Sequence, residues 1–212
     1  MSAPAIAIID YDMGNLHSVS KALEVVGAKP LVSDRPDDIV TADAVVLPGV
    51  GAFDPAMTHL HRRGLVPVIH QVIQQGMPFL GICLGLQVLF ESSEEGKEPG
   101  LGLFAGTVKR FHAEPGLTIP HMGWNQLTLT QSDCPLWQDL PPTPWVYFVH
   151  SYFVVSDDPE LVAATVCHGR QTVTGAIACK NVFACQFHPE KSGKVGLQVL
   201  RNFVNFVRRP SP

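Results

Sequence analysis

The sequence predicts one α/β domain over residues 1–212 in three layers: a mostly parallel central sheet, helices on both of its faces, and mixed or antiparallel strands added in the second half. Short apolar runs alternate with helical patterns in the first half, as in βαβ units. Strand-like runs separated by turns follow. A hydrophobic content of 46% supplies material for a core and excludes intrinsic disorder.

Hydrophobic periodicity predicts the individual elements. In the first half they are strands at 5–10, 44–47 and 78–82, a helix at 16–26 before Gly27, a helical stretch at 55–75 and a helix at 84–91. In the second half they are strands at 107–111, 126–129, 146–155, 161–166 and 173–187, then an amphipathic helix that includes 197–207. No repeat or linker interrupts this order, which favours a single domain.

Charge and cysteine content narrow the functional classes. The chain has 19 acidic and 15 basic side chains, and its net charge of -4 argues against a nucleic-acid binder. No apolar run approaches the length of about 20 residues that a membrane span requires. The five cysteines form no CxxC pair, which argues against a disulfide framework and a zinc site. We therefore expect an unexported, cytoplasmic protein without a metal or cofactor.

One cysteine has a distinctive context. Cys83 stands between Gly81 and Gly85 where a predicted strand meets a helix, which is the spacing of a nucleophile elbow. Such a turn exposes the sulfur at the carboxyl end of the sheet, where a helix N-terminus favours the thiolate. The alternative for Cys83 is a small buried hydrophobic residue. The other cysteines, Cys134, Cys167, Cys179 and Cys185, lack such a context, and we expect a structural role for each of them.

A thiolate needs a base, and one of the nine histidines is well placed to act as one. His188 follows a predicted strand and Glu190 comes two positions later, so an extended backbone would present both side chains on one side. A carboxylate on the far ring nitrogen would fix the tautomer of the imidazole. The alternative is a surface salt bridge. Together with the elbow, the pair predicts a triad of Cys83, His188 and Glu190.

Three segments resemble the signatures of the class I (triad) glutamine amidotransferases: 48–51 (PGVG), 81–87 (GICLGLQ) and 186–190 (QFHPE). The resemblance implies an enzyme that hydrolyses glutamine to glutamate and ammonia through a cysteinyl thioester. Gly49 and Gly51 would permit a turn whose amide groups point into the substrate site. The N–H groups of Val50 and Leu84 are then the candidates for the oxyanion hole. Without the resemblance, this segment would be an ordinary glycine-rich turn.

Further residues are candidates for binding glutamine. Gln87 lies one helical turn after Cys83 and faces the same side of the predicted helix. Glu95 is expected near the C-terminal end of that helix, where the helix dipole disfavours acids, and this indicates a function. The resemblance places Glu95 near the α-ammonium group and the backbone of Ser151 and Tyr152 near the α-carboxylate. The alternative for Glu95 is a solvated loop.

Three more segments, 10–16 (DYDMGNL), 120–125 (PHMGWN) and 190–193 (EKSG), resemble the branch of this family that serves histidine biosynthesis. Asp12 and Leu86 stand where glycine and methionine are frequent. This branch implies a heterodimer with a cyclase subunit of (β/α)8 barrel fold. Aromatic and methionine side chains are enriched at interface centres, although such residues are more often in the core. The candidate contacts with the cyclase are Asn15, His121, Met122, Trp124, Tyr147 and Lys191.

Three other functions compete with this interpretation. Class I amidotransferases of nucleotide or anthranilate synthesis share the triad but lack the segments at 10–16, 120–125 and 190–193. A cysteine hydrolase of the α/β-hydrolase fold is disfavoured because its acid usually precedes its histidine, whereas Glu190 follows His188. A regulatory subunit with a silent site is disfavoured because all three triad residues are present. Ammonia release in the presence of a cyclase would distinguish this last alternative.

Overall fold

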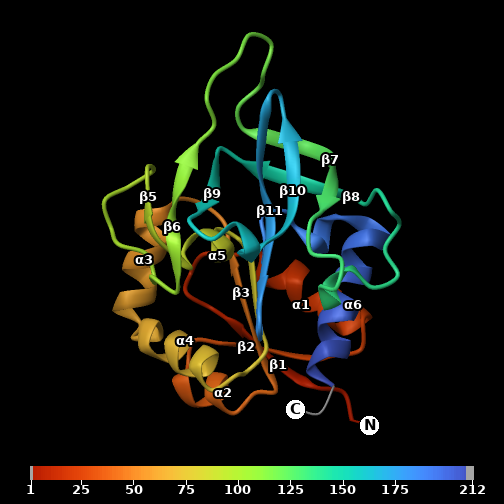
Figure 1. Cartoon of the computed structure of the whole chain (residues 1–212). Helices are drawn as coiled ribbons and strands as arrows, with labels where there is room; N and C mark the ends of the chain where they lie inside the picture. Colours follow the sequence, from red (N-terminus) through yellow and green to blue (C-terminus); the bar gives the residue numbers. More distant parts are fainter. Residues whose placement is uncertain (1, 209–212) are drawn as a thin grey trace.

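The computed structural model describes residues 2–208, and a nine-stranded sheet runs through its middle (Figure 1). The strand order is β2-β1-β3-β4-β12-β11-β10-β7-β8. Its parallel strands are β2 (Lys29–Ser33), β1 (Ala5–Ile9), β3 (Ala44–Gly49), β4 (Phe79–Cys83) and β12 (Val182–Cys185). Because these strands are parallel, their carboxyl ends lie at one edge and bring distant segments of the chain together.

The remaining strands pair antiparallel and extend the sheet on one side. They are β11 (Gln171–Cys179), β10 (Val162–His168), β7 (His121–Leu129) and β8 (Trp145–His150). A separate sheet of three strands consists of β5 (Phe90–Ser93), β6 (Phe104–Arg110) and β9 (Tyr152–Ser156). Only Ser151 separates β8 from β9, so the chain passes from one sheet to the other at that residue.

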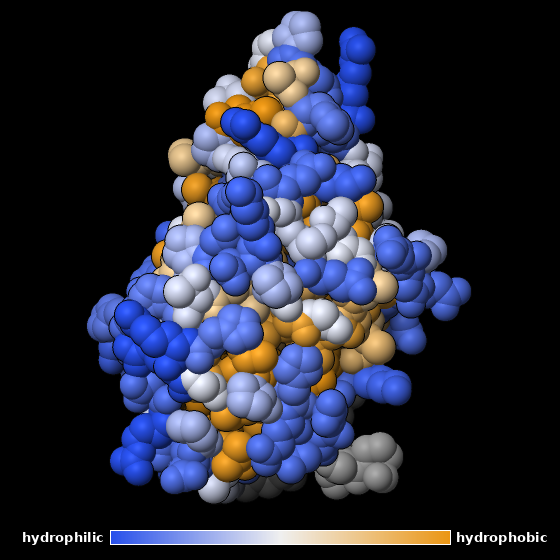
Figure 2. Space-filling model, turned by 90° about the vertical axis from the view of Figure 1, so that its left-hand side faces the viewer, coloured by the Kyte–Doolittle hydropathy of each residue, from blue (hydrophilic) through white to orange (hydrophobic). Residues whose placement is uncertain are grey.

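Helices cover both faces of the large sheet, so the three predicted layers are present (Figure 1). One face packs against α1 (Leu16–Val25) and α6 (Gly193–Val207). The other packs against α2 (Pro36–Val40), α3 (Phe53–Arg62), α4 (Leu65–Gln74) and the short α5 (Leu84–Gln87). Figure 2 shows the side that carries α3 and α4, where polar residues predominate and apolar ones lie between them, as amphipathic helices require.

Two predicted segments are divided by residues with a left-handed backbone. The helical stretch at 55–75 is two helices, because Gly64 has φ 65° and begins α4. The predicted strand at 173–187 is a hairpin of β11 and β12, with Lys180 at φ 54° in the turn. The predicted strand at 146–155 is likewise two strands, β8 and β9. The short edge elements β2 and α2 were not predicted, because neither carries a full hydrophobic period.

The predicted helix at 84–91 is wrong beyond Gln87. The carbonyl groups of Val88 and Leu89 accept hydrogen bonds from Leu101 and Leu103, at 2.8 and 2.9 Å, in place of helical partners. The chain then continues as β5. An apolar run of this length is compatible with helix and strand, and the tertiary contacts decide between them.

Three short 3-10 helices complete the fold, at Pro135–Trp137, Pro159–Leu161 and Pro189–Lys191. Among residues 2–208, none of the helices has both the length and the apolar character needed to cross a bilayer.

Candidate active site

Cys83 lies on the turn after β4, at the carboxyl edge of the parallel strands. Its backbone angles are φ 57° and ψ -109°, a conformation that L-residues rarely adopt, so the turn is strained. A side chain on Gly85 would collide with the Leu47 carbonyl group, and a Cβ on Gly81 would lie 2.7 Å from the Gly85 carbonyl oxygen. The two glycines therefore allow the close packing of this turn, and the strand-to-helix turn expected from the sequence is present.

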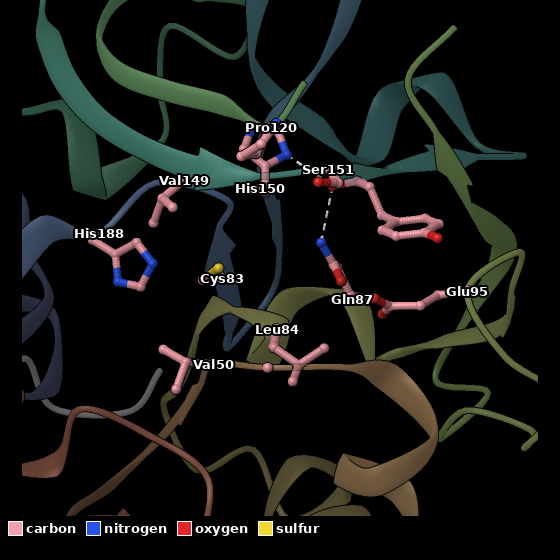
Figure 3. A pocket seen from close by; sticks show the side chains of 12 residues that line it. Val50, Cys83, Leu84, Gln87, Glu95, Pro120, Val149, His150, Ser151 and His188 are labelled. Atoms are coloured by element: carbon pink, nitrogen blue, oxygen red, sulfur yellow. Dashed lines mark hydrogen bonds between the residues drawn. The ribbon is translucent and has the colours of Figure 1, made fainter. Parts of the chain in front are cut away.

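His188 follows the neighbouring strand β12 and lines the same pocket as Cys83 (Figure 3). Its Nδ1 lies 2.8 Å from Glu190 Oε1, and the two side chains are only 2% and 1% exposed. The backbone forms a 3-10 helix over Pro189–Lys191, so the extended conformation expected there is wrong, although the pairing itself is present. The carboxylate accepts a hydrogen bond from the Nδ1–H group, and Nε2 makes no hydrogen bond within residues 2–208.

Opposing influences set the charge of His188. Burial lowers the pKa of its imidazole, but the nearby Cys83 side chain and the Glu190 carboxylate outweigh burial and raise the pKa to about 9. The imidazolium form is therefore favoured at neutral pH. An imidazolium next to a cysteine can stabilise a thiolate and can later donate a proton to a leaving group.

Two glutamines adjoin the sulfur. Gln186 is fully buried, and its Nε2 donates a hydrogen bond to Cys83 Sγ at 3.6 Å. Gln87 Nε2 donates to Gln186 Oε1 at 3.0 Å and to the Tyr152 carbonyl group at 3.0 Å. Gln186 was not among the residues predicted to form the site. The sequence feature that could have identified Gln186 is a polar side chain within the apolar run at 182–187. Burying an amide costs free energy unless it is hydrogen-bonded, so such a residue indicates a bonding partner.

The segment after β3 lies beside the elbow, since Gly49 pairs with the last residue of β4 in the sheet register. A Cβ on Gly49 would lie 2.8 Å from Leu84 Cβ and would also collide with the Tyr11 hydroxyl group, so only glycine fits. Gly51 has φ 101°, which also favours glycine. Between them, Val50 is 39% exposed and lines the pocket together with Leu84.

The pocket has a volume of about 340 Å³, which is within the range of small-molecule sites. It is lined by Val50, Gly51, Cys83, Leu84, Gln87, Glu95, Pro120, Val149, His150, Ser151, Tyr152 and His188. All residues predicted to bind glutamine are in this set except Gly49, which packs behind the pocket.

Glu95 reaches the pocket from the loop after β5, so its expected place near a helix C-terminus is wrong. Its Oε2 accepts a hydrogen bond at 2.9 Å from the Phe53 N–H group at the start of α3. Partial burial raises the pKa of Glu95, and the bond from Phe53 opposes this effect. An acidic side chain at this position can bind a cationic group of a ligand.

Large apolar side chains gather on one face of the β7–β8 pair. Met122 is 62% exposed, Trp124 is 53% exposed, and Trp145, which was not predicted, is 51% exposed. Trp124 lies opposite Tyr147 in the strand register, with ring centroids 6.3 Å apart. We call these four residues the β7–β8 patch. Val149 lies opposite Met122 and lines the pocket, so the patch continues to the pocket.

The other predicted contact residues lie elsewhere. Lys191 is exposed at the end of the 3-10 helix that carries Glu190. Asn15 caps α1, where its side chain accepts a hydrogen bond from the Ser18 N–H group at 3.4 Å. His121 is only 4% exposed, so its prediction as a surface contact is wrong. Strand alternation explains this, because Met122 and Trp124 point outward and His121 points inward.

Asp12 has φ 69°, in the left-handed region that glycine adopts most easily. The Asp12 carboxylate forms ion pairs with Arg63 at 2.6 Å and with Arg62 at 3.2 Å. The hydrogen bond from Arg63 is the main reason why the pKa of Asp12 is lowered. These contacts hold the loop after β1 against α3.

Comparison with known proteins identifies the family of this chain. Residues 7–206 match the family of class I glutamine amidotransferases, and the chain belongs to that family. It is 81% identical to imidazole glycerol phosphate synthase subunit HisH of Thermosynechococcus vestitus, over 98% of this chain and 100% of that one. It is 69% identical to the subunit of the same name from Cyanothece sp., over 97% of each chain.

Solved structures with low sequence identity share the fold. PurLQS from Thermotoga maritima superposes with a TM-score of 0.75 at 21% identity, over 97% of this chain and 100% of that one. A glutamine amidotransferase from the same organism gives a TM-score of 0.66 at 16% identity, over 99% and 100%. The predicted fold class is therefore confirmed.

Proposed function

We propose that this protein is the glutaminase subunit of imidazole glycerol phosphate synthase, and that it hydrolyses L-glutamine to L-glutamate and ammonia for histidine biosynthesis. One observation carries the proposal: Cys83 and His188 line one pocket, and the buried Glu190 carboxylate bonds the ring of His188 at Nδ1. Relatives that are 81% and 69% identical carry the corresponding name. We further propose that residues 1–212 act as one domain in the cytoplasm.

The first half-reaction forms a thioester. The Cys83 thiolate attacks the amide carbon of glutamine, and the carbonyl oxygen takes up the negative charge. The N–H groups of Val50 and Leu84 stabilise this oxyanion, and one such donor is typically worth about 3 to 4 kcal/mol. As the C–N bond breaks, His188 Nε2 transfers its proton to the leaving nitrogen, which departs as ammonia.

The second half-reaction hydrolyses the thioester. His188, now neutral, takes a proton from water as the oxygen attacks the carbonyl carbon. The oxyanion collapses, the C–S bond breaks, and the sulfur leaves as a thiolate beside the regenerated imidazolium. The new carboxyl group of glutamate loses its proton to solvent. Glu190 stays ionised throughout, holding the His188 ring in one tautomer.

The remaining pocket residues orient the substrate. The Glu95 carboxylate binds the α-ammonium group of glutamine, which compensates for its partial burial. The backbone of Ser151 and Tyr152, which also line the pocket, binds the α-carboxylate. Gln87 supports that backbone through its hydrogen bond to the Tyr152 carbonyl group.

The partner is a cyclase of the HisF type with a (β/α)8 barrel. Ammonia released into bulk water is protonated and loses its nucleophilicity, so the pocket must open into a passage in the partner. The β7–β8 patch is the proposed docking surface, because exposed apolar residues of this kind mark protein interfaces. Asn15 and Lys191 are proposed to contact the cyclase around this patch.

Substitution of the nucleophile tests the proposal. In the complex with the cyclase, we expect Cys83→Ala to abolish glutamine-dependent product formation while added ammonium salts still support the cyclase reaction. Cys167→Ala is the matched control, because it removes an exposed thiol far from the pocket lining. Equal loss of both activities in Cys83→Ala would refute a catalytic role. Wild-type chain that releases no ammonia in the complex would instead indicate a silent regulatory subunit.

A further inference from the structure

Two buried histidines that the mechanism does not use face each other on the inner side of β7 and β8. His121 lies directly opposite His150 in the antiparallel register, and His121 Nδ1 is 3.0 Å from His150 Nε2. The rings pack among Phe111 and Phe148. His150 lines the pocket, whereas His121 does not.

The direction of each hydrogen bond that the two rings make follows from the groups bonded at either end of the pair. These groups are the Tyr152 carbonyl oxygen and the Asn125 side-chain amide. The Tyr152 carbonyl oxygen, 2.7 Å from His150 Nδ1, can only accept, so Nδ1 carries the proton. His150 Nε2 is then an acceptor, and His121 Nδ1 must donate to it. His121 Nε2 is left as an acceptor for the Asn125 side-chain amide, whose Nδ2 is 3.0 Å away.

Asn125 cannot reverse this order by turning its amide group. Its Nδ2 also donates to the Cys167 carbonyl group at 2.8 Å, and its Oδ1 accepts from the Gln126 N–H group at 2.8 Å. Both bonds would be lost in a flipped amide. Burial, together with the neighbouring histidines, lowers the pKa of His121 to about 4 and that of His150 to about 3. Both rings are therefore neutral, as the bonding order requires.

The same carbonyl oxygen connects these histidines to the nucleophile. The Tyr152 carbonyl group accepts from His150 and from Gln87, and both bonds are drawn in Figure 3. Gln87 donates in turn to Gln186, which donates to Cys83 Sγ. A donor aimed at sulfur interacts better with a thiolate than with a thiol.

We propose that one chain of hydrogen bonds sets the reactivity of Cys83, and its members are, in order, Asn125, His121, His150, Tyr152, Gln87 and Gln186. His121 and His150 are thus positioning residues, since they act on the sulfur only through others. The hydrogen-bond chain starts at Asn125, which follows Trp124 in β7 but points to the opposite, inner face of the strand together with His121. Its relevance to catalysis rests on the proposed function.

The test measures alkylation of Cys83 by iodoacetamide in the full chain, without glutamine, with each cysteine peptide resolved by mass spectrometry. His150→Leu removes the donor to Tyr152, and we expect the Cys83 rate to fall about three- to tenfold, the usual effect of one hydrogen bond. His150→Asn keeps an N–H group near the Nδ1 position and should restore most of the rate. The exposed thiols of Cys167 and Cys179 should react unchanged.

His168→Gln is the matched control. The His168 ring stacks on His121 with centroids 4.2 Å apart. Its Nε2, however, is hydrogen-bonded to the Thr118 carbonyl group, which is not part of the proposed chain of hydrogen bonds. This variant should alkylate Cys83 at the wild-type rate. A wild-type rate in His150→Leu, or equal rates in the Leu and Asn variants, would overturn the proposal.

A measurement on the unsubstituted protein covers the case in which His150→Leu does not fold. In ¹⁵N spectra of histidine-labelled protein, His121 and His150 should both be neutral with the proton on Nδ1. The opposite tautomer on either ring would contradict the proposed chain of hydrogen bonds. Neither experiment uses glutamine, so a complex without glutaminase activity would refute the proposed function and leave this inference standing.

Discussion

The pocket has two walls of different construction. The parallel wall comes from the carboxyl ends of β3, β4 and β12 and includes Cys83 and His188. The antiparallel wall comes from β8 and β9 and includes His150 and Tyr152. The parallel wall presents Cys83 to the pocket on a strained turn and His188 on a loop. The second holds its polar groups through side-chain hydrogen bonds between neighbouring strands.

Each wall carries one buried histidine, and the net pKa shifts of the two are opposite. Burial lowers both pKa values, yet that of His188 is raised to about 9 and that of His150 is lowered to about 3. Their partners explain the difference. The Cys83 side chain and the Glu190 carboxylate raise the pKa of His188 beyond the effect of burial. The Tyr152 carbonyl group also raises the pKa of His150, but burial and the neighbouring histidines outweigh it. The parallel wall therefore carries charge, and the antiparallel wall carries fixed neutral bonds.

The largest expected effects come from the parallel wall. His188→Ala should reduce glutaminase turnover by about a hundredfold to ten-thousandfold, since it removes the general acid and base. Glu190→Gln keeps the shape and should cost less, because this residue orients and stabilises the imidazolium. Single-turnover ammonia release in the complex measures both. Turnover within a factor of two of wild type in Glu190→Gln would reduce the triad to a dyad.

A second prediction concerns coupling of the parallel wall to the partner. Gly49 and Gly51 allow the Val50 peptide two orientations, and we expect docking with the cyclase's ligand bound to turn its N–H group inward. One missing oxyanion donor corresponds to a few hundredfold, or about 3 to 4 kcal/mol. Ammonia release should therefore be compared for the chain alone, with cyclase, and with cyclase and ligand. Similar rates in all three mixtures would refute this switch.

A third prediction tests the outer face of the antiparallel wall. Trp124→Ala should weaken binding of the cyclase about thirtyfold, because aromatic residues at interface centres often contribute about 2 kcal/mol or more. Titration calorimetry of the complex would measure it. Leu31→Ala is the control, since Leu31 is 44% exposed on β2 at the opposite edge of the sheet. Equal affinity in the two variants would remove the patch from the docking surface.

The smallest effect is a pH dependence of turnover, which we expect to come from His188 in the parallel wall. The raised pKa of His188 means that its imidazolium prevails below about 9 and is lost above it. Turnover should therefore fall with rising pH through that range, approaching about tenfold per pH unit. In Glu190→Gln the descending limb should move to lower pH. A limb at the same pH in both proteins would assign it to another group.

Much of the fold was predictable from local patterns. The strands before Asp10 and around 44–47 are buried apolar runs, and α1 shows a full helical period that ends at Gly27. Predictions were wrong where one pattern fits two structures. The apolar run after Leu84 could be helix or strand, and its carbonyl groups are bonded by residues 101–104. The edge strand β2 is mostly exposed, so it lacks the pattern that identifies a buried strand.

For the site, local sequence patterns predicted the candidate reactive residues and their order along the chain. Glycine spacing around Cys83 and the short separation of His188 and Glu190 are local properties, because a turn and a neighbouring pair depend on few residues. The hydrogen bond from Gln186 to the sulfur and the burial of His121 became known from the three-dimensional packing of the strands. Those facts depend on strand register, which pairs segments far apart in the chain and leaves no periodic signal within either segment.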